Sequence, residues 1–485
     1  MVMDASYWAE LLRQREISLA ELLQMIQQKI KALNPKLNAI LSFEPDLAQQ
    51  AYDSKDWDQF LFGGLPVPVK ILGPDAKGLA NTSATRLFKD SIAVKDSNFI
   101  LQAKKCGLIP VGTTNAPEFG FKNVTDSKLY GDCHNPWDFE RTAGGSSGGA
   151  ASAVAAGIFP LALASDGGGS IRIPASYTGL IGLKPSRGTM PVGPDSWRSW
   201  QGAAINFGLT VSIEDTRRLF YGLRYPIATA PYQVTQAEWM HFLEDDYSKR
   251  PLRVAFSLES PVGSKVSQEA KQAVLSAVAF MENDLGYQVT EAAPKIDGRE
   301  VMNQYYLMNG AETAAMFAEI EKIRQIKLQA KEVEPLTYAL YRYGQRILAQ
   351  DYVNSLNYWD KVSYQLDQFL NDYDLYLTPT TAQVAPKISE RQEILVPELF
   401  TDSQLSLAKH TELIYQMFEP SLAQTPFTQL ANLTGNPAIS LPTGLFANLP
   451  LGIQLLAPKG REDILFEVGH EFEQAGRFHL PPSYN

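Results

Sequence analysis

The 485-residue chain contains few of the residues that build disulfide frameworks and metal sites. It has only two cysteines, Cys106 and Cys133, and five histidines scattered along its length. Two cysteines do not support a disulfide framework, and the histidines lack the spacing of a metal-ligand motif. We therefore predict a protein of a reducing compartment, the cytoplasm, that binds no metal and uses no cofactor.

Clustered positive charge and long apolar runs are also lacking. The chain has 43 Lys and Arg against 53 Asp and Glu, for a formal net charge of −10. Nucleic-acid surfaces depend on clustered Lys and Arg, so we expect no nucleic-acid partner. No stretch approaches the roughly 18 apolar residues of a membrane span. The first residues also lack the basic and apolar segments of a signal peptide, so we expect no membrane partner.

What is present indicates a large globular α/β protein. Hydrophobic residues make up 45% of the chain, and no Pro/Gly/Ser-rich or charge-biased linker interrupts it, which predicts a single domain over residues 1–485. Strand-like runs at residues 65–72 and 158–164 alternate with helix-like segments at residues 98–106 and 150–157. This alternation predicts an α/β layer architecture.

Two further regions are predicted to be helical. Ser18 and Glu21 form a capping box that starts a helix, and we expect the pair Asn34-Pro35 to end it. The middle of the chain, about residues 225–373, is more polar, and we expect it to cover one side of the sheet. Its candidate helices cover residues 268–285, 299–327 and 353–370.

The segment from residue 144 to residue 187 holds two serines in two glycine-rich turns. The first turn reads Gly-Gly-Ser-Ser-Gly-Gly around Ser146, and the second reads Gly-Gly-Gly-Ser and ends at Ser170. Glycine allows positive φ and close backbone approach, so such turns can aim several N–H groups at one point. That is the layout of an oxyanion hole beside a nucleophile. The strand-like run before the second turn places this turn at a strand end.

A serine hydroxyl needs a base, and Lys70 is the best candidate. The five histidines lie in polar or helical surroundings and are expected to be surface or capping residues. In the strand-like run, Lys70 shares a face with Pro68 and Leu72, where its ammonium would be poorly solvated. Desolvation lowers a lysine pKa toward neutrality, where the amine can act as a general base. The alternative is a lysine that protects an edge strand from aggregation.

With Lys70, Ser146 and Ser170 assembled, the chain resembles the amidase signature family, serine hydrolases with a Ser-cisSer-Lys triad. The resemblance implies an α/β fold with a large mixed central β-sheet covered by helices on both faces, in which residues 225–373 shape the substrate pocket. It runs along nearly the whole chain. The matching segments are residues 17–18, 34–39, 64–70, 114–119, 135–137, 144–187, 377–380, 432–438 and 449–454.

The resemblance implies a role for each residue of the triad. Ser170 attacks the amide carbonyl, and Ser146, preceded by a cis peptide bond, relays protons between Ser170 and neutral Lys70. The product is a carboxylate with ammonia or an amine. The oxyanion is expected to bind the N–H groups of the second turn. These belong to Gly167, Gly168, Gly169 and Ser170.

Three further residues match family positions that support the site. Ser147, Asp166 and Arg172 are expected to buttress it by hydrogen bonds and charge pairing, and Asp166 with Arg172 also fits an ordinary structural ion pair. The chain departs from the family pattern at two places. Many relatives carry an acidic residue after the lysine, where this chain has Ile71, and a Thr or Ile where it has Gly167. Neither departure removes a reacting group.

Two competing functions follow from the same glycines. Gly145 to Gly149 also fits Gly-x-Ser-x-Gly, the nucleophile elbow of α/β-hydrolase esterases, with Ser147 as nucleophile. The polar segment before it, residues 138–142, argues against this, because an elbow follows an apolar strand. A nucleotide-binding module is the second alternative, but the turns lack the Lys-Ser/Thr of a P-loop and the spacing of a dinucleotide fingerprint.

Two kinds of relative within the family suggest different substrates. The glutamine-hydrolysing component of tRNA-dependent amidotransferases typically has an Arg-Tyr-Asp-Gly segment after an Ala-Glu pair, whereas here Ala311-Glu312 continues into an apolar helix. Residues 81–83, 115–120 and 460–465 resemble bacterial hydrolases of cyclic nylon dimers. Those enzymes carry an Asn near the position of Phe121, which argues against their substrate.

We therefore predict an amidase that acts on linear small-molecule amides. The aromatic residues Trp197, Trp200, Tyr305 and Tyr306 are candidates for the pocket wall, although core filling is the expectation for any one of them. A homodimer is the default assembly, because two-fold dimers are the commonest oligomers.

Overall fold

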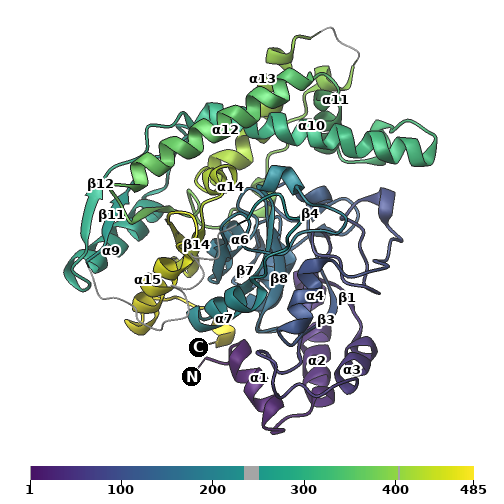
Figure 1. Ribbon diagram of the computed structural model, residues 1–485, viewed down its shortest axis with the longest axis vertical. Helices are drawn as coiled ribbons and strands as arrows, with labels where there is room; N and C mark the ends of the chain where they lie inside the picture. The colour runs from purple at the N-terminus through teal and green to yellow at the C-terminus, as the bar shows by residue number, and fades with distance from the viewer. Residues whose placement is uncertain (1, 234–250, 402–404, 485) are drawn as a thin grey trace.

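The computed structural model describes residues 2–233, 251–401 and 405–484. Its centre is an eleven-stranded mixed β-sheet with helices on both faces (Figure 1). The strand order is β1-β3-β2-β8-β10-β9-β14-β15-β13-β11-β12. These strands are β1 (Ile40–Phe43), β2 (Leu65–Lys70), β3 (Leu108–Thr114), β8 (Ala162–Asp166), β9 (Ile181–Lys184), β10 (Ile205–Thr210), β11 (Arg253–Phe256), β12 (Gln288–Glu291), β13 (Leu375–Pro379), β14 (Ala438–Phe446) and β15 (Leu449–Leu456). The expected fold class is confirmed.

Strand β2 lies inside the sheet, where it pairs in parallel with both β3 and β8. All six of its residues are buried, and Lys70, its last residue, lies opposite Thr114 of β3. The alternative of an edge-strand lysine is therefore wrong. The carboxyl ends of parallel strands meet at one edge of a sheet, where ligands bind in α/β proteins. Lys70 and Asp166, which ends β8, therefore reach the same edge.

Two groups of helices pack on the sheet. In the first, α5 (Gly148–Ala155) and α6 (Arg172–Thr178) contact each other; α5 also contacts β8, and α6 contacts β9, β14 and β15. In the second, α7 (Ile213–Leu223) contacts β10 and is flanked by α4 (Asn98–Lys105) and α15 (Glu462–Gln474). The Ala-rich composition of α5 lets it lie close to the strands, because its side chains are small and every one of its residues is buried.

The middle region adds the predicted helices. They are α9 (Gln268–Asn283), α10 (Gly298–Arg324) and α12 (Ala349–Leu370), to which the structure adds α11 (Pro335–Gly344). Helix α9 packs on β13, β14 and β15 as expected, whereas α10 to α12 and α13 (Leu407–Gln424) pack on one another around a second hydrophobic cluster. In Figure 1 they form a layer beyond the upper end of the sheet. Residues 234–250 of this region lie outside the described residues.

The N-terminal helices are α1 (Ala5–Arg13), α2 (Leu19–Leu37) and α3 (Pro45–Asp53). The capping box of Ser18 and Glu21 is confirmed, but α2 does not end at Asn34. It continues through Pro35, which cannot donate an i→i−4 hydrogen bond, and ends where Asn38 adopts a left-handed conformation and donates its N–H to Asn34 O.

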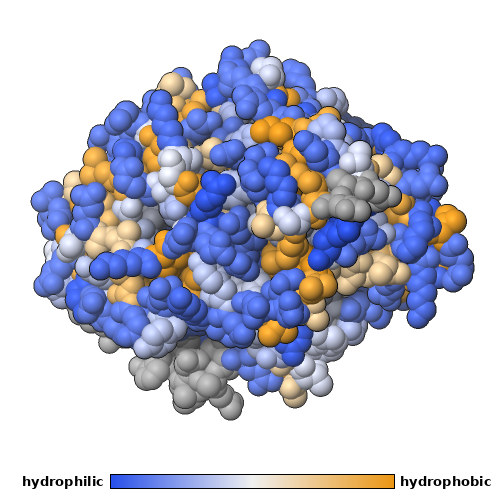
Figure 2. Space-filling model, turned by 90° about the horizontal axis from the view of Figure 1, so that it is seen from above, coloured by the Kyte–Doolittle hydropathy of each residue, from blue (hydrophilic) through white to orange (hydrophobic). Residues whose placement is uncertain are grey.

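The remaining strands and the remaining α-helix are short. They are β4 (Asp126–Ser127), β5 (Gly131–Asp132), β6 (His134–Asn135), β7 (Asp138–Thr142) and α14 (Gln429–Thr434). Figure 2, seen from the side of α10 to α13, shows a mainly hydrophilic surface with small, separate apolar groups. Across the described ranges, no helix combines the length and apolar character that a bilayer span requires.

Candidate active site

Lys70 is buried and hydrogen-bonded at the edge of the sheet. Only 2% of its surface is exposed. Its Nζ donates to Ser146 Oγ at 2.7 Å, and it lies 3.0 Å from Ser165 Oγ and 3.4 Å from Ser165 O. Burial lowers the pKa of Lys70 to about 7, although the carboxylate of Asp166 opposes this shift. The amine is therefore largely neutral slightly above neutral pH, as a general base requires.

The first glycine-rich turn brings Ser146 to this amine. The peptide bond between Gly145 and Ser146 is cis, as the resemblance implies. A side chain at Gly145 would collide with the backbone of Val124, since a Cβ there would lie 2.6 Å from it. Ser147 follows and is fully buried; its N–H donates to Ser170 O at 3.1 Å and its hydroxyl to Ser165 O at 3.1 Å. Ser147 thus ties the two turns together.

The second turn follows β8 and is held by side chains on its carbonyl oxygens. Tyr305 Oη, from α10, donates to Gly167 O at 3.0 Å, and Thr428 Oγ1 donates to Gly168 O at 2.7 Å. A side chain at either position would force a neighbour to move, because a Cβ on Gly168 would lie 2.6 Å from the Tyr305 hydroxyl and one on Gly167 2.6 Å from the Trp200 ring. Trp200 and Tyr305, named from the sequence as wall or core residues, therefore both contact this turn.

One of the expected oxyanion donors has a hydrogen-bond partner within the protein. The N–H of Gly169 donates to Asp166 Oδ1 at 2.7 Å, so this hydrogen is taken up by the carboxylate. The sequence could not reveal this, because the Asp-Gly-Gly-Gly-Ser spacing does not determine which N–H turns back to the aspartate. The N–H groups of Gly167, Gly168 and Ser170 remain as candidates.

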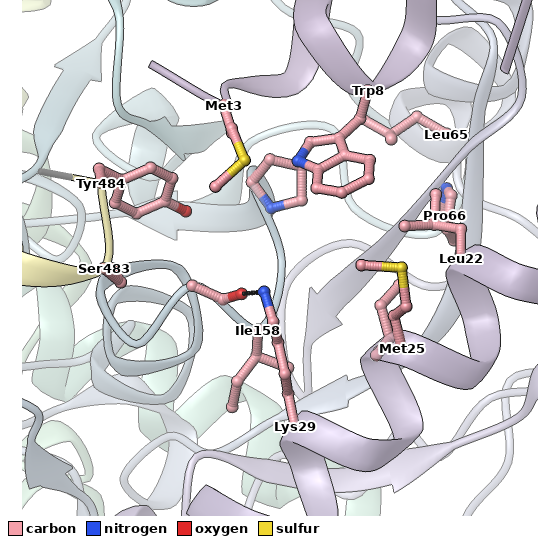
Figure 3. A pocket seen from close by; sticks show the side chains of 13 residues that line it. Met3, Trp8, Leu22, Met25, Lys29, Leu65, Pro66, Ile158, Ser483 and Tyr484 are labelled. Carbon is pink, nitrogen blue, oxygen red and sulfur yellow. Dashed lines mark hydrogen bonds between the residues drawn. The ribbon is translucent and has the colours of Figure 1, made fainter. Parts of the chain in front are cut away.

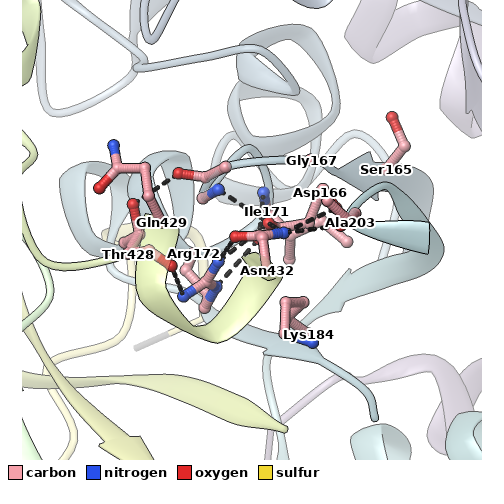
Figure 4. A network of polar contacts seen from close by, with 12 residues as sticks. Ser165, Asp166, Gly167, Ile171, Arg172, Lys184, Ala203, Thr428, Gln429 and Asn432 are labelled. Atoms are coloured by element: carbon pink, nitrogen blue, oxygen red, sulfur yellow. Dashed lines mark hydrogen bonds and ion pairs between the residues drawn. The ribbon is translucent and has the colours of Figure 1, made fainter. Parts of the chain in front are cut away.

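Asp166 and Arg172 form a fully buried ion pair beneath the second turn (Figure 4). Arg172 contacts both carboxylate oxygens, at 2.9 and 3.0 Å, and its Nη1 donates to Thr428 O and Gln454 Oε1. Asn432 donates to Asp166 Oδ1 and accepts from Arg172. Burial alone would raise the pKa of Asp166, but the charge and hydrogen bonds of Arg172 with those of Asn432 hold it well below its ordinary value. This network is consistent with the supporting role that the sequence predicts for Asp166 and Arg172.

Replacing Asp166 with asparagine is expected to lower the free energy of unfolding by about 3–5 kcal/mol, because it leaves the Arg172 charge buried without a counterion. Urea denaturation followed by tryptophan fluorescence measures this loss. The control is Glu412→Gln, which breaks an ion pair with Lys409 at the surface and is expected to have a small effect. Equal stabilities of the two variants would contradict the role given to the buried pair.

Two functional contacts were not anticipated from the sequence. Ser165 lies beside Lys70, and Asn432 orders the ion pair. The position of Ser165, one residue before the end of β8, was the available signal, because strand ends at this edge carry site residues. Asn432 is more than 250 residues away in the chain, and nothing local marks its partner.

Ser146 and Ser170 line one pocket with about 1110 Å³ of empty space, part of it open to solvent. Apolar side chains contribute to its wall, among them Phe119, Met190 and Trp200. Ser147 is not among the residues that line it, which agrees with its complete burial. The pocket therefore presents Ser170 and Ser146, and not Ser147, to a ligand. Among the described residues, no group of His, Cys, Asp and Glu is placed to hold a metal ion.

A separate hollow lies where the two ends of the chain meet (Figure 3). Met3, Trp8 and Tyr484 line it, and Lys29 crosses its floor to donate to Gly157 O at 2.6 Å. The sequence-predicted site residues are not part of its lining. The hollow lies between the N-terminal helices and the C-terminal turn and is not the site of the triad.

Comparison with known proteins agrees with this geometry. The Amidase family model matches residues 21–466. The chain belongs to the amidase signature family. It is accordingly an enzyme of a family of hydrolases that act on amide C–N bonds. Among solved structures, 6-aminohexanoate cyclic dimer hydrolase complexed with substrate superposes with a TM-score of 0.87 at 28% identity, covering 99% of each chain.

Two relatives of this amidase illustrate the range of the family. A lipoamidase of Enterococcus faecalis is 37% identical over 98% of this chain, which spans 63% of the lipoamidase's own length. A 6-aminohexanoate-cyclic-dimer hydrolase of Paenarthrobacter ureafaciens is 32% identical over 97% of this chain and 94% of its own length. The relatives' names thus include different amide substrates.

Proposed function

We propose that this amidase is a serine amidohydrolase that cleaves small linear carboxamides through an acyl-enzyme on Ser170. The observation that carries the proposal is the 2.7 Å hydrogen bond from the buried Lys70 Nζ to Ser146 Oγ, because Ser146 lines the same pocket as Ser170. A buried lysine with a pKa of about 7 supplies a neutral amine, and the intervening serine supplies the path to the nucleophile.

In the acylation step, Ser170 Oγ forms a bond to the amide carbonyl carbon while its proton passes to Ser146, whose own proton passes to Lys70. The tetrahedral intermediate collapses when the C–N bond breaks, and the leaving nitrogen receives the proton back through Ser146. Ammonia or an amine departs as a neutral molecule. Water then attacks the acyl group by the same proton path in reverse, which releases the carboxylate and frees Ser170.

The second turn supports stabilisation of the oxyanion. The carbonyl and N–H of a trans peptide point in opposite directions, so the N–H of Gly168 points away from the Tyr305 hydroxyl that binds Gly167 O. We assign the oxyanion to the N–H groups of Gly167, Gly168 and Ser170. Loss of one such donor typically lowers kcat by about 10²- to 10³-fold.

The esterase alternative with Ser147 as nucleophile has less support. The hydroxyl of Ser147 is fully buried and donates to Ser165 O, so it is engaged away from the pocket. The strand before it, β7, is polar, unlike the apolar strand that precedes a nucleophile elbow.

Glutamine hydrolysis, as the glutamine-hydrolysing component of a tRNA-dependent amidotransferase, is the alternative within the family. One such glutamyl-tRNA(Gln) amidotransferase component, from Picosynechococcus, is 31% identical over 96% of this chain. In this amidase, Glu312 lies within α10 and accepts hydrogen bonds from Trp200 and Gln201. The Arg-Tyr-Asp-Gly segment typical of that component does not follow Ala311-Glu312, so we favour a free amidase. The two cysteines without a disulfide framework favour the cytoplasm as its compartment.

A panel of amides tests the proposal. Aryl amides, aliphatic amides, glutamine and cyclic lactams are offered separately, and released ammonia or amine is measured. We expect linear amides to be cleaved, and a fluorophosphonate to block the activity while modifying Ser170, as mapped by peptide mass. Cleavage of glutamine alone would favour the amidotransferase role, and an adduct on another residue would overturn the assignment of the nucleophile.

A further inference from the structure

The indole of Trp200 lies where a side chain on the first glycine of the second turn would be. A Cβ on Gly167 would lie 2.6 Å from Cζ3 and 2.7 Å from Cε3 of the indole, closer than real side-chain carbons approach other atoms. Residue 167 is therefore restricted to glycine by the indole. Trp200 also lines the pocket that holds Ser146 and Ser170. Its ring thus forms pocket wall directly against the turn.

Other aromatic rings fix the indole in this position. Phe121 stacks on it with 5.9 Å between ring centroids and 6° between planes. Tyr305 meets it edge-on at 6.1 Å and 78°. Such ring contacts add to the stability gained by burial and define the orientation of the indole. The wall is therefore a specific arrangement of rings.

The backbone that carries the indole is held by Glu312. Trp200 and Gln201 both have positive φ, 49° and 51°, a conformation that is costly for residues other than glycine. Glu312 accepts from the N–H of Trp200 at 3.2 Å and from Nε2 of Gln201 at 3.0 Å, and Tyr352 Oη donates to it at 3.2 Å. The carboxylate thus supports an unfavourable turn.

Helix α10 connects this support to the catalytic turn. Tyr305 and Glu312 are seven residues apart on α10, which is about two helical turns, so they lie on one face. The first holds Gly167 O, and the second holds the segment that places the indole against Gly167. One face of α10 therefore sets the distance between the second turn and the Trp200 indole.

We propose that Trp200 is a specificity-determining residue, which limits the size of the substrate group beside the second turn, and that Glu312 is its positioning residue. The inference rests on the proposed function, because it assumes that the scissile carbonyl lies at this turn. The preferred substrates are then amides with a slender substituent next to the carbonyl. The effect of a substitution at Gly167 is expected to depend on which side chain is present at Trp200.

The pair is tested with Gly167→Ala, Trp200→Ala and the double variant, by kcat/KM on a slender amide and on one branched beside the carbonyl. We expect Gly167→Ala to lose about 10²-fold, as displaced catalytic groups do. Trp200→Ala is expected to shift the ratio of the two kcat/KM values at least tenfold toward the branched amide. The double variant is expected to recover at least tenfold over Gly167→Ala, because the added methyl then has space.

Gly168→Ala provides the matched control. Its Cβ would meet the Tyr305 hydroxyl and not the indole, so Trp200→Ala is not expected to rescue it. Simple additivity of Gly167→Ala and Trp200→Ala would overturn the inference, since independent sites add. Circular dichroism shows whether Gly167→Ala folds. If it does not fold, the inference is tested by Trp200→Ala alone, and an unchanged ratio of the two kcat/KM values in that variant overturns the inference.

Glu312 is tested by the same selectivity ratio. Glu312→Ala is expected to shift the selectivity ratio toward the branched amide, as Trp200→Ala does. Glu312→Gln keeps one acceptor oxygen, so its ratio is expected to lie closer to that of the wild type. A Glu312→Ala variant with unchanged selectivity would contradict the positioning role.

Fluorophosphonate labelling of the wild-type enzyme distinguishes a failure of the proposed function from a failure of this inference. No adduct on Ser170 in the wild type overturns the proposed function and this inference together, whereas labelling without rescue overturns the inference alone.

Discussion

Replacing Lys70 with methionine is expected to lower kcat/KM on a good amide substrate by roughly 10²- to 10⁴-fold at pH 8. Methionine fills a similar volume in the buried site but cannot accept the proton that Ser146 passes on. The rate of the wild-type enzyme is expected to rise with pH through about 7, because burial lowers the pKa of Lys70 to about 7 and only the neutral amine is a base. In the variant this rise is expected to disappear. Initial rates between pH 5.5 and 9 measure both effects.

The matched control is Lys184→Met. Lys184 is also fully buried, and burial lowers its pKa well below the usual range, but its Nζ donates to Pro185 O, whereas that of Lys70 donates to Ser146 Oγ. We expect this variant to keep the rise of the rate with pH. A profile that flattens in Lys184→Met and persists in Lys70→Met would show that Lys70 is not the base.

Replacing Ser170 with alanine is expected to lower kcat by roughly 10⁶-fold, the loss found when the catalytic serine is removed from a serine hydrolase. The hydroxyl is the group that bonds to the carbonyl carbon, and the water that replaces it is not positioned by the turn. Measurements of amine release over long incubations, with enzyme at micromolar concentration, give the residual rate.

Ser147→Ala is the control for Ser170→Ala. Ser147 loses only its hydrogen bond to Ser165 O, and its backbone N–H continues to bind Ser170 O. We expect a modest loss of stability, on the order of 1 kcal/mol, and most of the activity to remain. Abolished activity in Ser147→Ala together with an active Ser170→Ala would support the nucleophile elbow instead.

The sequence was sufficient to predict the parts of the site that local chemistry determines. Glycine-rich turns after a strand-like run, and a lysine at the end of an apolar strand, depend on spacing within a few residues. Both features appear in the structure, with Lys70 ending β2 and the second turn following β8. The helices of the middle region were also predicted to within a few residues, because their apolar periodicity is long.

Contacts between distant segments could not be predicted. Asn432 reaches Asp166 from the far end of the chain, and Tyr305 reaches Gly167 from α10. Their side chains have no local pattern that names a partner. The capture of the Gly169 N–H by Asp166 was missed for a related reason, since backbone direction in a glycine-rich turn is set by the packing around it.

The central claim is that Ser170 carries the acyl group of the substrate during turnover. Acid quenching of the enzyme with a slowly hydrolysed amide or its ester analogue, followed by peptide mass mapping, tests this most directly. The account predicts a mass increase equal to the acyl group on the peptide containing Ser170, formed more rapidly above pH 7 than below it. An acyl group on Ser147, or turnover in which no serine is ever modified, would contradict it.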